Sequence, residues 1–169
     1  NMNLAEIRNA LGSITEFLGQ PVNLVGFDAC LMGTMEVAYE LREYASVMVA
    51  SEQPEPVSGW SYDAIMAQLV ASPDMDATEL ATTIVDNYYL DHLPMGYTMA
   101  AIDLTQIDSL IGSLNNLAQS LVVYSDSNIE VIRQYAGATM VAVENAVIFE
   151  KHGTKWPDSH GLAIYFPKY

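Results

Sequence analysis

Apolar residues recur along this chain in two spacings, one typical of amphipathic helices and the other of short buried strands. Between Leu4 and Leu18 they fall every three or four residues, which predicts a helix with one apolar face. The apolar run from Val22 to Phe27 is bounded by turn residues and is too short for a helix, so it predicts a buried strand. A similar run over residues 46–50 predicts a second buried strand.

The remaining segments continue this alternation of helices and strands. Two further strands are predicted, over residues 97–102 and 162–166. The pattern indicates an α/β fold with a mostly parallel sheet flanked by helices. Only four strands are visible, whereas such sheets commonly have about five or six. We therefore expect the N-terminal strands of the sheet to be missing from this chain. Helical spacing predicts further helices over residues 32–44, 62–71, 77–90, 105–124 and 128–149.

Composition and charge exclude several classes of protein. The chain has 6 Lys and Arg against 21 Asp and Glu, a net charge of −15, which argues against nucleic acid as a partner because binding it requires a basic face. No apolar run approaches the roughly 20 residues that a membrane-spanning helix needs. The single cysteine, Cys30, excludes an internal disulfide and a thiolate metal cluster.

The surroundings of Cys30 predict a reactive thiol. A lone cysteine is more often an inert buried residue. Here, however, it follows a predicted strand in an α/β sheet, and such sheets bind ligands at the carboxyl ends of their strands. Asp28 would be a costly charge in a core, and Gly33 lets the backbone turn closely. Ala-Cys followed by a glycine is also similar to the nucleophile signature of caspases.

Three blocks of sequence carry a resemblance to a known family: GFDACLMGTMEVAYEL, VMVASEQPEPVSGWSYDAIM and GLAIYFPKY. With these blocks in this order, the chain resembles the clostripain family of cysteine peptidases, of the caspase-like clan, from about residue 4 to residue 169. The resemblance implies a caspase-like fold and an endopeptidase that cleaves after Arg or Lys through a Cys-His dyad. It also implies that residues 1–169 are the C-terminal, nucleophile-bearing part of the peptidase domain.

The same resemblance assigns roles to two residues of the first block. Cys30 matches the catalytic nucleophile, and its backbone N–H would form part of the oxyanion hole. Asp28 matches the acidic residue at the base of the S1 pocket, which holds the residue before the cleaved bond (P1). A carboxylate there would bind a guanidinium or ammonium through charge-assisted hydrogen bonds. The alternative for Asp28 is a strand-end turn or a helix cap.

The second block is expected to line the substrate groove, again by analogy with the clan. Trp60 would form a wall of the S1 pocket, because aromatic faces attract cations. Glu52 or Asp63 would supply a second acid. Ordinary packing of the loop is the alternative for these side chains. The candidate substrate-binding residues of this block are Ser51, Glu52, Trp60, Tyr62 and Asp63.

A histidine that would complete the dyad is missing from its expected place. In caspases it lies about 50 residues before the cysteine. Only 29 residues precede Cys30, and none is histidine. His92, His152 and His160 all follow the cysteine, where surface or structural roles are the better interpretation. We therefore expect the catalytic histidine to come from an upstream segment or a separate light chain. This chain would then be a natural heavy chain or a truncated piece.

Other expectations follow from the resemblance. The substrates are peptides or proteins with a basic P1 residue, and the protein is expected to be autoprocessed and secreted, periplasmic or on the surface of bacteria. The sequence requires no cofactor. Calcium, which some clostripain-like enzymes use, is left open with no site assigned, and helix capping explains the acids at 74–79 better than calcium binding. The alternative function is an inactive caspase-like homologue that binds peptides or partners.

Overall fold

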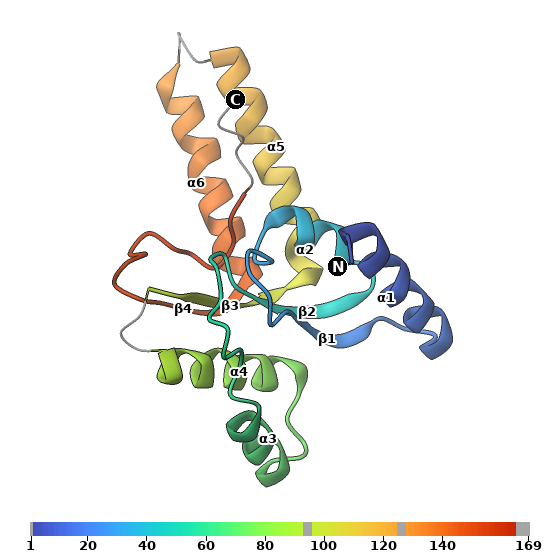
Figure 1. Ribbon diagram of the computed structural model, residues 1–169. Helices are drawn as coiled ribbons and strands as arrows, with labels where there is room; N and C mark the ends of the chain where they lie inside the picture. The colour runs from blue at the N-terminus through green and yellow to red at the C-terminus, as the bar shows by residue number, and fades with distance from the viewer. Residues whose placement is uncertain (1, 93–95, 125–127, 165–169) are drawn as a thin grey trace.

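The computed structural model describes residues 2–92, 96–124 and 128–164 and has three layers, with a sheet between two groups of helices (Figure 1). The strands lie in the order β1-β2-β3-β4. In chain order the elements are α1 Leu4–Leu18, β1 Val22–Gly26, α2 Met35–Leu41, β2 Ala45–Ala50, α3 Tyr62–Ala71, α4 Ala77–His92, β3 Thr98–Asp103, the 3₁₀ helix η1 Leu104–Gln106, α5 Ile107–Tyr124, α6 Ile129–Ala146 and β4 Val147–His152.

The central strands alternate their side chains between two separate cores, as a pleated sheet dictates. Met48 and Ile102 point to the face covered by α2, α5 and α6. Val49 and Ala101 point to the opposite face, which α3 and α4 cover. In Figure 1, α3 and α4 lie below the sheet, while α5 and α6 rise above it as a long hairpin. No helix in the described part of the chain has both the length and the hydrophobicity needed to cross a membrane.

The α/β class and the flanking helices are confirmed, but the pairing of the strands differs from the expectation. β1 is parallel to β2, whereas β2–β3 and β3–β4 are antiparallel. The four described strands therefore form a mixed sheet and not a mostly parallel one. The difference arises at β3, which runs opposite to the other three described strands. A second difference is β4, which begins directly after α6 ends at Ala146. No glycine or proline separates the two, so the apolar pattern predicted one helix as far as Phe149.

The predicted last strand is reduced to a single contact in the described residues. Ala163 forms an isolated parallel bridge with Thr34, just before α2. Tyr165 and Phe166, which were also assigned to this strand, lie outside the described residues. The bridge nevertheless ties the end of the described chain to the segment that carries Cys30.

The β1 side of the sheet is less covered than its centre. Every residue of β2 except Ser46 is buried, whereas no residue of β1 is fully buried. α1 packs against α2 and β1, yet it buries none of its residues completely, and Phe17 is 88% exposed. Among the described strands β1 pairs only with β2, so its other edge is open. Cys30 follows β1 and therefore lies near this open edge.

Candidate active site

Cys30 lies exposed in a tight turn between β1 and α2. The next residue, Leu31, has a φ of 62°, a left-handed conformation that costs about 1–2 kcal/mol for a residue with a Cβ. Two hydrogen bonds hold the turn: Leu31 N–H donates to Gln53 O at 3.3 Å, and Gly33 N–H donates to Ser51 O at 2.8 Å. A Cβ on Gly33 would lie 2.7 Å from the carbonyl carbon of Ser51, so this close approach requires glycine.

The helix after the turn starts later than the sequence predicted. α2 begins at Met35, with Thr34 as its N-cap, instead of at residue 32. Residues 30–33 are drawn out of the helix because their backbone pairs with the start of the loop at residues 51–60. Cys30 therefore belongs to this turn and not to the first turn of the helix.

The loop 51–60 reaches the thiol with its backbone. The N–H of Glu55 donates to Cys30 Sγ at 3.2 Å, and the carbonyl oxygen of Glu55 lies 3.9 Å from the same sulfur. The sulfur is thus exposed but fixed in direction, since it is held between its own turn and this loop.

Two carboxyl groups are anchored next to the thiol by one tryptophan. Trp60 donates its backbone N–H to Asp28 Oδ2 at 3.2 Å and its indole N–H to Glu55 Oε2 at 3.0 Å. Tyr62 donates its hydroxyl to Asp28 Oδ2 at 3.0 Å. A Cβ on Gly59, which has a φ of 67°, would lie 2.6 Å from Asp28 Oδ2, so the loop needs glycine there as well.

Trp60, which donates to both acids, is fixed in position because it is part of a hydrophobic core. It is only 8% exposed and packs in the cluster formed with α3 and α4. A Cβ on Gly26, the last residue of β1, would lie 2.8 Å from the Trp60 ring. The ring therefore packs directly against the end of the strand that leads to Cys30, and its two N–H groups set the positions of both acids.

The environment changes the titration of the groups around Glu55. Burial, with a contribution from the neighbouring Asp28, raises the pKa of Glu55 to about 7, although hydrogen bonds from Trp60 and the Ala29 backbone act in the opposite direction. Burial, followed by the hydrogen bond to Asp28, raises the pKa of Tyr62. Burial also raises the pKa of Tyr88, with Glu55 adding to the shift. Glu55 therefore gains its charge near neutral pH, whereas both tyrosines stay protonated there.

Other predicted site residues face elsewhere. Ser51 is buried, and its hydroxyl lies 3.1 Å from that of Thr98. Glu52 receives a hydrogen bond from the hydroxyl of Ser159. Asp63 is exposed in the first turn of α3. Of the acids in this block, it is Glu55 that lies beside Asp28.

Sequence reasoning missed Glu55 because it lies in an irregular loop, whose path no periodicity reveals. Prolines on either side, Pro54 and Pro56, were the available signal. Each proline fixes its own φ and restricts the residue before it, so a charged residue between two of them has a constrained direction.

No histidine side chain in the described part of the structure has a hydrogen bond with Cys30 Sγ, whose contacts are with the Glu55 backbone. His152, at the end of β4, pairs through Nδ1 with Glu150 Oε2 at 2.9 Å. β4 is three strand spacings from β1, roughly 14 Å at about 4.8 Å per spacing, which is beyond hydrogen-bond reach. His160 lies in a separate cavity, and the side chain of His92 lies outside the described part of the structure.

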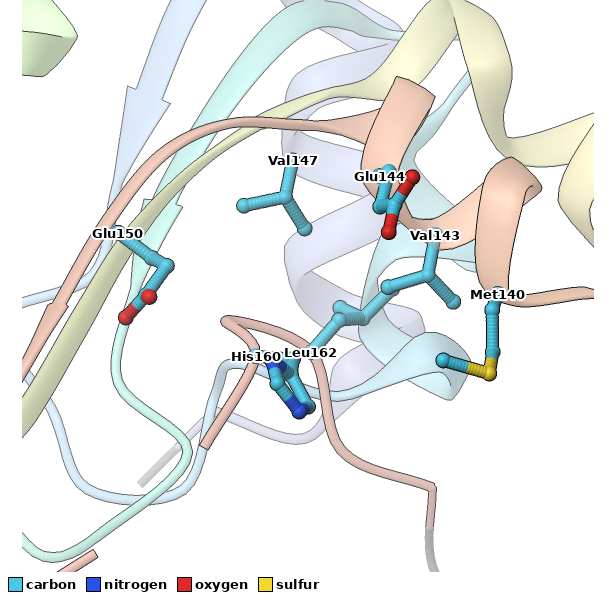
Figure 2. A pocket seen from close by; sticks show the side chains of 7 residues that line it. All are labelled: Met140, Val143, Glu144, Val147, Glu150, His160 and Leu162. Atoms are coloured by element: carbon cyan, nitrogen blue, oxygen red, sulfur yellow. The ribbon is translucent and has the colours of Figure 1, made fainter. Parts of the chain in front are cut away.

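That cavity has a volume of about 430 Å³ and lies between α6 and the segment after β4. Figure 2 shows His160 and Leu162 of this segment opposite Met140 and Val143 of α6. The cavity is on the α6 face of the sheet, whereas Trp60 packs on the other face. The full lining of the cavity is Met140, Val143, Glu144, Val147, Glu150, His160 and Leu162.

Within the described ranges, no group of three or more His, Cys, Asp or Glu side chains is arranged to hold a metal ion.

Comparison with known proteins identifies the family of this chain. The sequence pattern of the clostripain family, peptidase family C11, matches residues 1–147. The chain belongs to the clostripain family. Clostripain from Hathewaya histolytica is 41% identical in an alignment over 68 residues, and the alignment covers 36% of this chain and 13% of that protein. The chain thus matches only a small part of this curated relative.

Solved structures of family members share the fold. A secreted C11 cysteine protease from Bacteroides thetaiotaomicron, in complex with an irreversible peptide inhibitor, has a TM-score of 0.73 at 18% identity, over 99% of this chain and 58% of that chain. A clostripain from B. thetaiotaomicron ATCC 29148, in complex with the peptide inhibitor BTN-VLTK-AOMK, has a TM-score of 0.71 at 15% identity, over 97% of this chain and 85% of that one. The predicted resemblance to the clostripain family and its fold is therefore confirmed.

Proposed function

We propose that this chain is the nucleophile-bearing part of a cysteine endopeptidase that cleaves peptide bonds after Arg or Lys. The observation that carries the proposal is the pairing of an exposed, oriented thiol with an anchored carboxylate. Cys30 Sγ receives a hydrogen bond from the Glu55 backbone, and Asp28, two residues earlier, is fixed by Trp60 and Tyr62. Membership of the clostripain family supports the same chemistry.

In this proposal Cys30 attacks the carbonyl carbon of the bond to be cleaved. The sulfur forms a thioester with the substrate's acyl group, its proton passes to a base, and the amine leaves with a proton from that base. Water then hydrolyses the thioester and regenerates the thiol. The backbone N–H of Cys30 would stabilise the intermediate oxyanion, an interaction worth about 3–4 kcal/mol per donor in related chemistry.

Asp28 would select the basic P1 side chain. Charge-assisted hydrogen bonds from a guanidinium or ammonium to a fixed carboxylate are about twice as strong as neutral ones. The net charge of −15 also favours the approach of cationic peptides. In a related clostripain of known structure, the bound inhibitor carries the peptide VLTK, which ends in lysine.

The general base would come from a segment that pairs with the open edge of β1. A parallel strand added there would end about 4.8 Å from the end of β1, and so near Cys30. An upstream segment or a separate light chain that ends such a strand with a histidine would complete the dyad. Autoprocessing into two chains and secretion from a bacterium belong to the same proposal, supported by a C11 relative described as secreted.

A second candidate function is an inactive homologue that binds peptides. It is favoured by one observation: in the described residues no histidine contacts Cys30 Sγ, whose hydrogen-bond contacts are with the Glu55 backbone. In this case the acidic pocket would still bind basic side chains, but no bond would be cleaved.

Peptide hydrolysis by the full-length protein separates the two functions. The substrates are three fluorogenic peptides that differ only in Arg, Lys or citrulline at P1, since citrulline is nearly the shape of Arg without its charge. We expect kcat/KM for Arg and Lys to exceed that for citrulline by at least about 100-fold. Cys30→Ala should abolish hydrolysis while peptide binding persists. Binding without hydrolysis by the unmodified protein would support the inactive homologue, and hydrolysis by Cys30→Ala would refute the role of Cys30.

A further inference from the structure

We propose that Glu55 is a second specificity-determining carboxylate, which shares one proton with Asp28 when no substrate is bound and exchanges it for the basic P1 side chain. The inference rests on the proposed function, because it requires a substrate with a cationic P1 residue. The inference goes beyond the proposed function by naming a second acid and a proton that leaves when the substrate binds.

A common frame holds the two carboxyl groups. Trp60 donates to Asp28 through its backbone N–H and to Glu55 through its indole N–H. Because the indole packs in a core between Gly26 and the helices α3 and α4, neither acid can move far without disturbing Trp60. The same Glu55 also donates its backbone N–H to Cys30 Sγ. Its carboxyl is therefore part of the site that holds the thiol.

One oxygen of Glu55 has no hydrogen-bond partner of its own. Oε2 accepts the indole N–H, but Oε1 is buried without a partner among the described residues. The adjacent Asp28 carboxylate can only accept hydrogen bonds when it is charged. Two arrangements give Glu55 Oε1 a partner and also reduce the repulsion between the two carboxyl groups. One is a proton between the carboxyl groups, and the other is a cation between them. The first fits the free protein, and the second fits a bound Arg or Lys side chain.

The groups that face Glu55 add no positive charge. They are Asp28 and Cys30 from the turn after β1, Tyr62 from α3, Tyr88 from α4 and the Trp60 indole. Burial and Asp28 together raise the pKa of Glu55 to about 7. Below this pH Glu55 is therefore mostly protonated, and above it the charge of Glu55 adds to that of Asp28.

Substrate binding is then linked to proton release. A basic P1 side chain stabilises charged Glu55, so binding near pH 7 moves one proton from Glu55 to solvent and leaves the P1 cation between two carboxylates. By linkage, affinity for a basic P1 residue must rise as the pH increases through 7. A neutral P1 residue leaves the proton in place, so its affinity does not gain from the same pH increase.

The test measures how the selectivity of the full-length protein for Arg over citrulline at P1 depends on pH. Peptidyl chloromethyl ketones with Arg or citrulline at P1 alkylate Cys30, and the ratio of their second-order rate constants is measured from pH 6 to pH 8. The titration of Cys30 itself cancels in this ratio. We expect the Arg-to-citrulline ratio to rise about tenfold over this interval, which corresponds to a bound-state Glu55 pKa about two units lower.

Glu55→Gln keeps the shape of the side chain but removes its proton equilibrium. We expect its ratio to stay flat, about tenfold below the value that the unmodified protein has at pH 6, because a bound-state pKa near 5 gives charged Glu55 part of its effect already at that pH. Asp74→Asn, which removes an exposed acid between α3 and α4, is the matched control and should keep the full rise. A rise that persists in Glu55→Gln, or a flat ratio in the unmodified protein, would overturn the inference.

A second measurement does not depend on whether Glu55→Gln folds. Calorimetric binding of an Arg-P1 peptide to Cys30→Ala, in two buffers of different ionisation enthalpy, counts the protons released. We expect about half a proton at pH 7, since half of Glu55 is then protonated, and no release would overturn the inference. If iodoacetamide labels Cys30 but neither peptidyl reagent does, the proposed function fails instead.

Discussion

Two regions of this molecule, the cavity at α6 and the surroundings of Cys30, differ in the way their polar groups are held. The cavity at α6 has a volume of about 430 Å³ and is lined by aliphatic side chains together with Glu144, Glu150 and His160. In the cavity, Glu150 pairs with His152, which does not line it. Around Cys30, the thiol, Asp28 and Glu55 are each fixed by an N–H of the same loop, residues 51–60. Hydrogen bonds from one loop thus converge on the surroundings of Cys30, and this convergence, not the volume of a cavity, is the reason why we propose the reactive site there.

The largest effect is expected at Asp28. Asp28→Asn retains an oxygen that can accept hydrogen bonds from Trp60 and Tyr62 but loses the charge that would bind P1. We expect kcat/KM for Arg and Lys peptides to fall about 100- to 1000-fold, while the citrulline peptide changes little. Asp74→Asn should leave all three unchanged. An equal loss for charged and neutral peptides would mean that Asp28 supports the structure and not specificity.

A smaller effect tests the turn that positions the thiol. Gly33→Ala would force a Cβ to within 2.7 Å of the Ser51 carbonyl carbon, so the turn must shift. We expect a loss of about 1–3 kcal/mol in the free energy of unfolding and slower alkylation of Cys30 by the Arg-P1 reagent. Gly137→Ala in α6 is the matched control, because a Cβ there meets nothing within 4 Å. Equal stability of the two variants, measured by denaturant unfolding, would contradict the close packing of this turn.

The smallest effect is expected in the cavity. His160→Ala and Glu144→Gln change polar groups that line it, on the opposite face of the sheet from Trp60. We expect kcat/KM for the Arg peptide to stay within about twofold of the unmodified protein, as for substitutions away from a reacting centre. If His160→Ala abolished hydrolysis, the cavity would have to be part of the catalytic site.

The sequence predicted the parts of the site that sit at regular elements. Cys30 and Asp28 follow a strand whose apolar run is easy to recognise, and the strand-turn-helix order fixes their place at the end of the sheet. Trp60, in the loop, and Tyr62, at the start of α3, both contact Asp28. The positions of Cys30 and Asp28 were predictable because periodicity locates the ends of strands. The roles of these two residues, and of Trp60 and Tyr62, came from the family resemblance and stay predictions.

The features that the sequence did not predict depend on contacts between segments that are distant along the chain. Glu55 meets Asp28 only because Gly59 and Trp60 fold the loop back onto β1, a path that no local pattern encodes. β4 was assigned to a helix because Val147, Ile148 and Phe149 continue the apolar pattern without a break. Their β-branched and aromatic side chains suit a strand once β3 offers an edge for pairing.

The site of modification by a Lys-P1 chloromethyl ketone tests the central claim most directly. The full-length protein would be treated with the reagent and mapped by peptide mass spectrometry. Our account predicts a single adduct on Cys30, little reaction with an acidic-P1 reagent, and no adduct when the proposed histidine-bearing segment is absent. An adduct at another residue, or equal labelling by the acidic reagent, would contradict it.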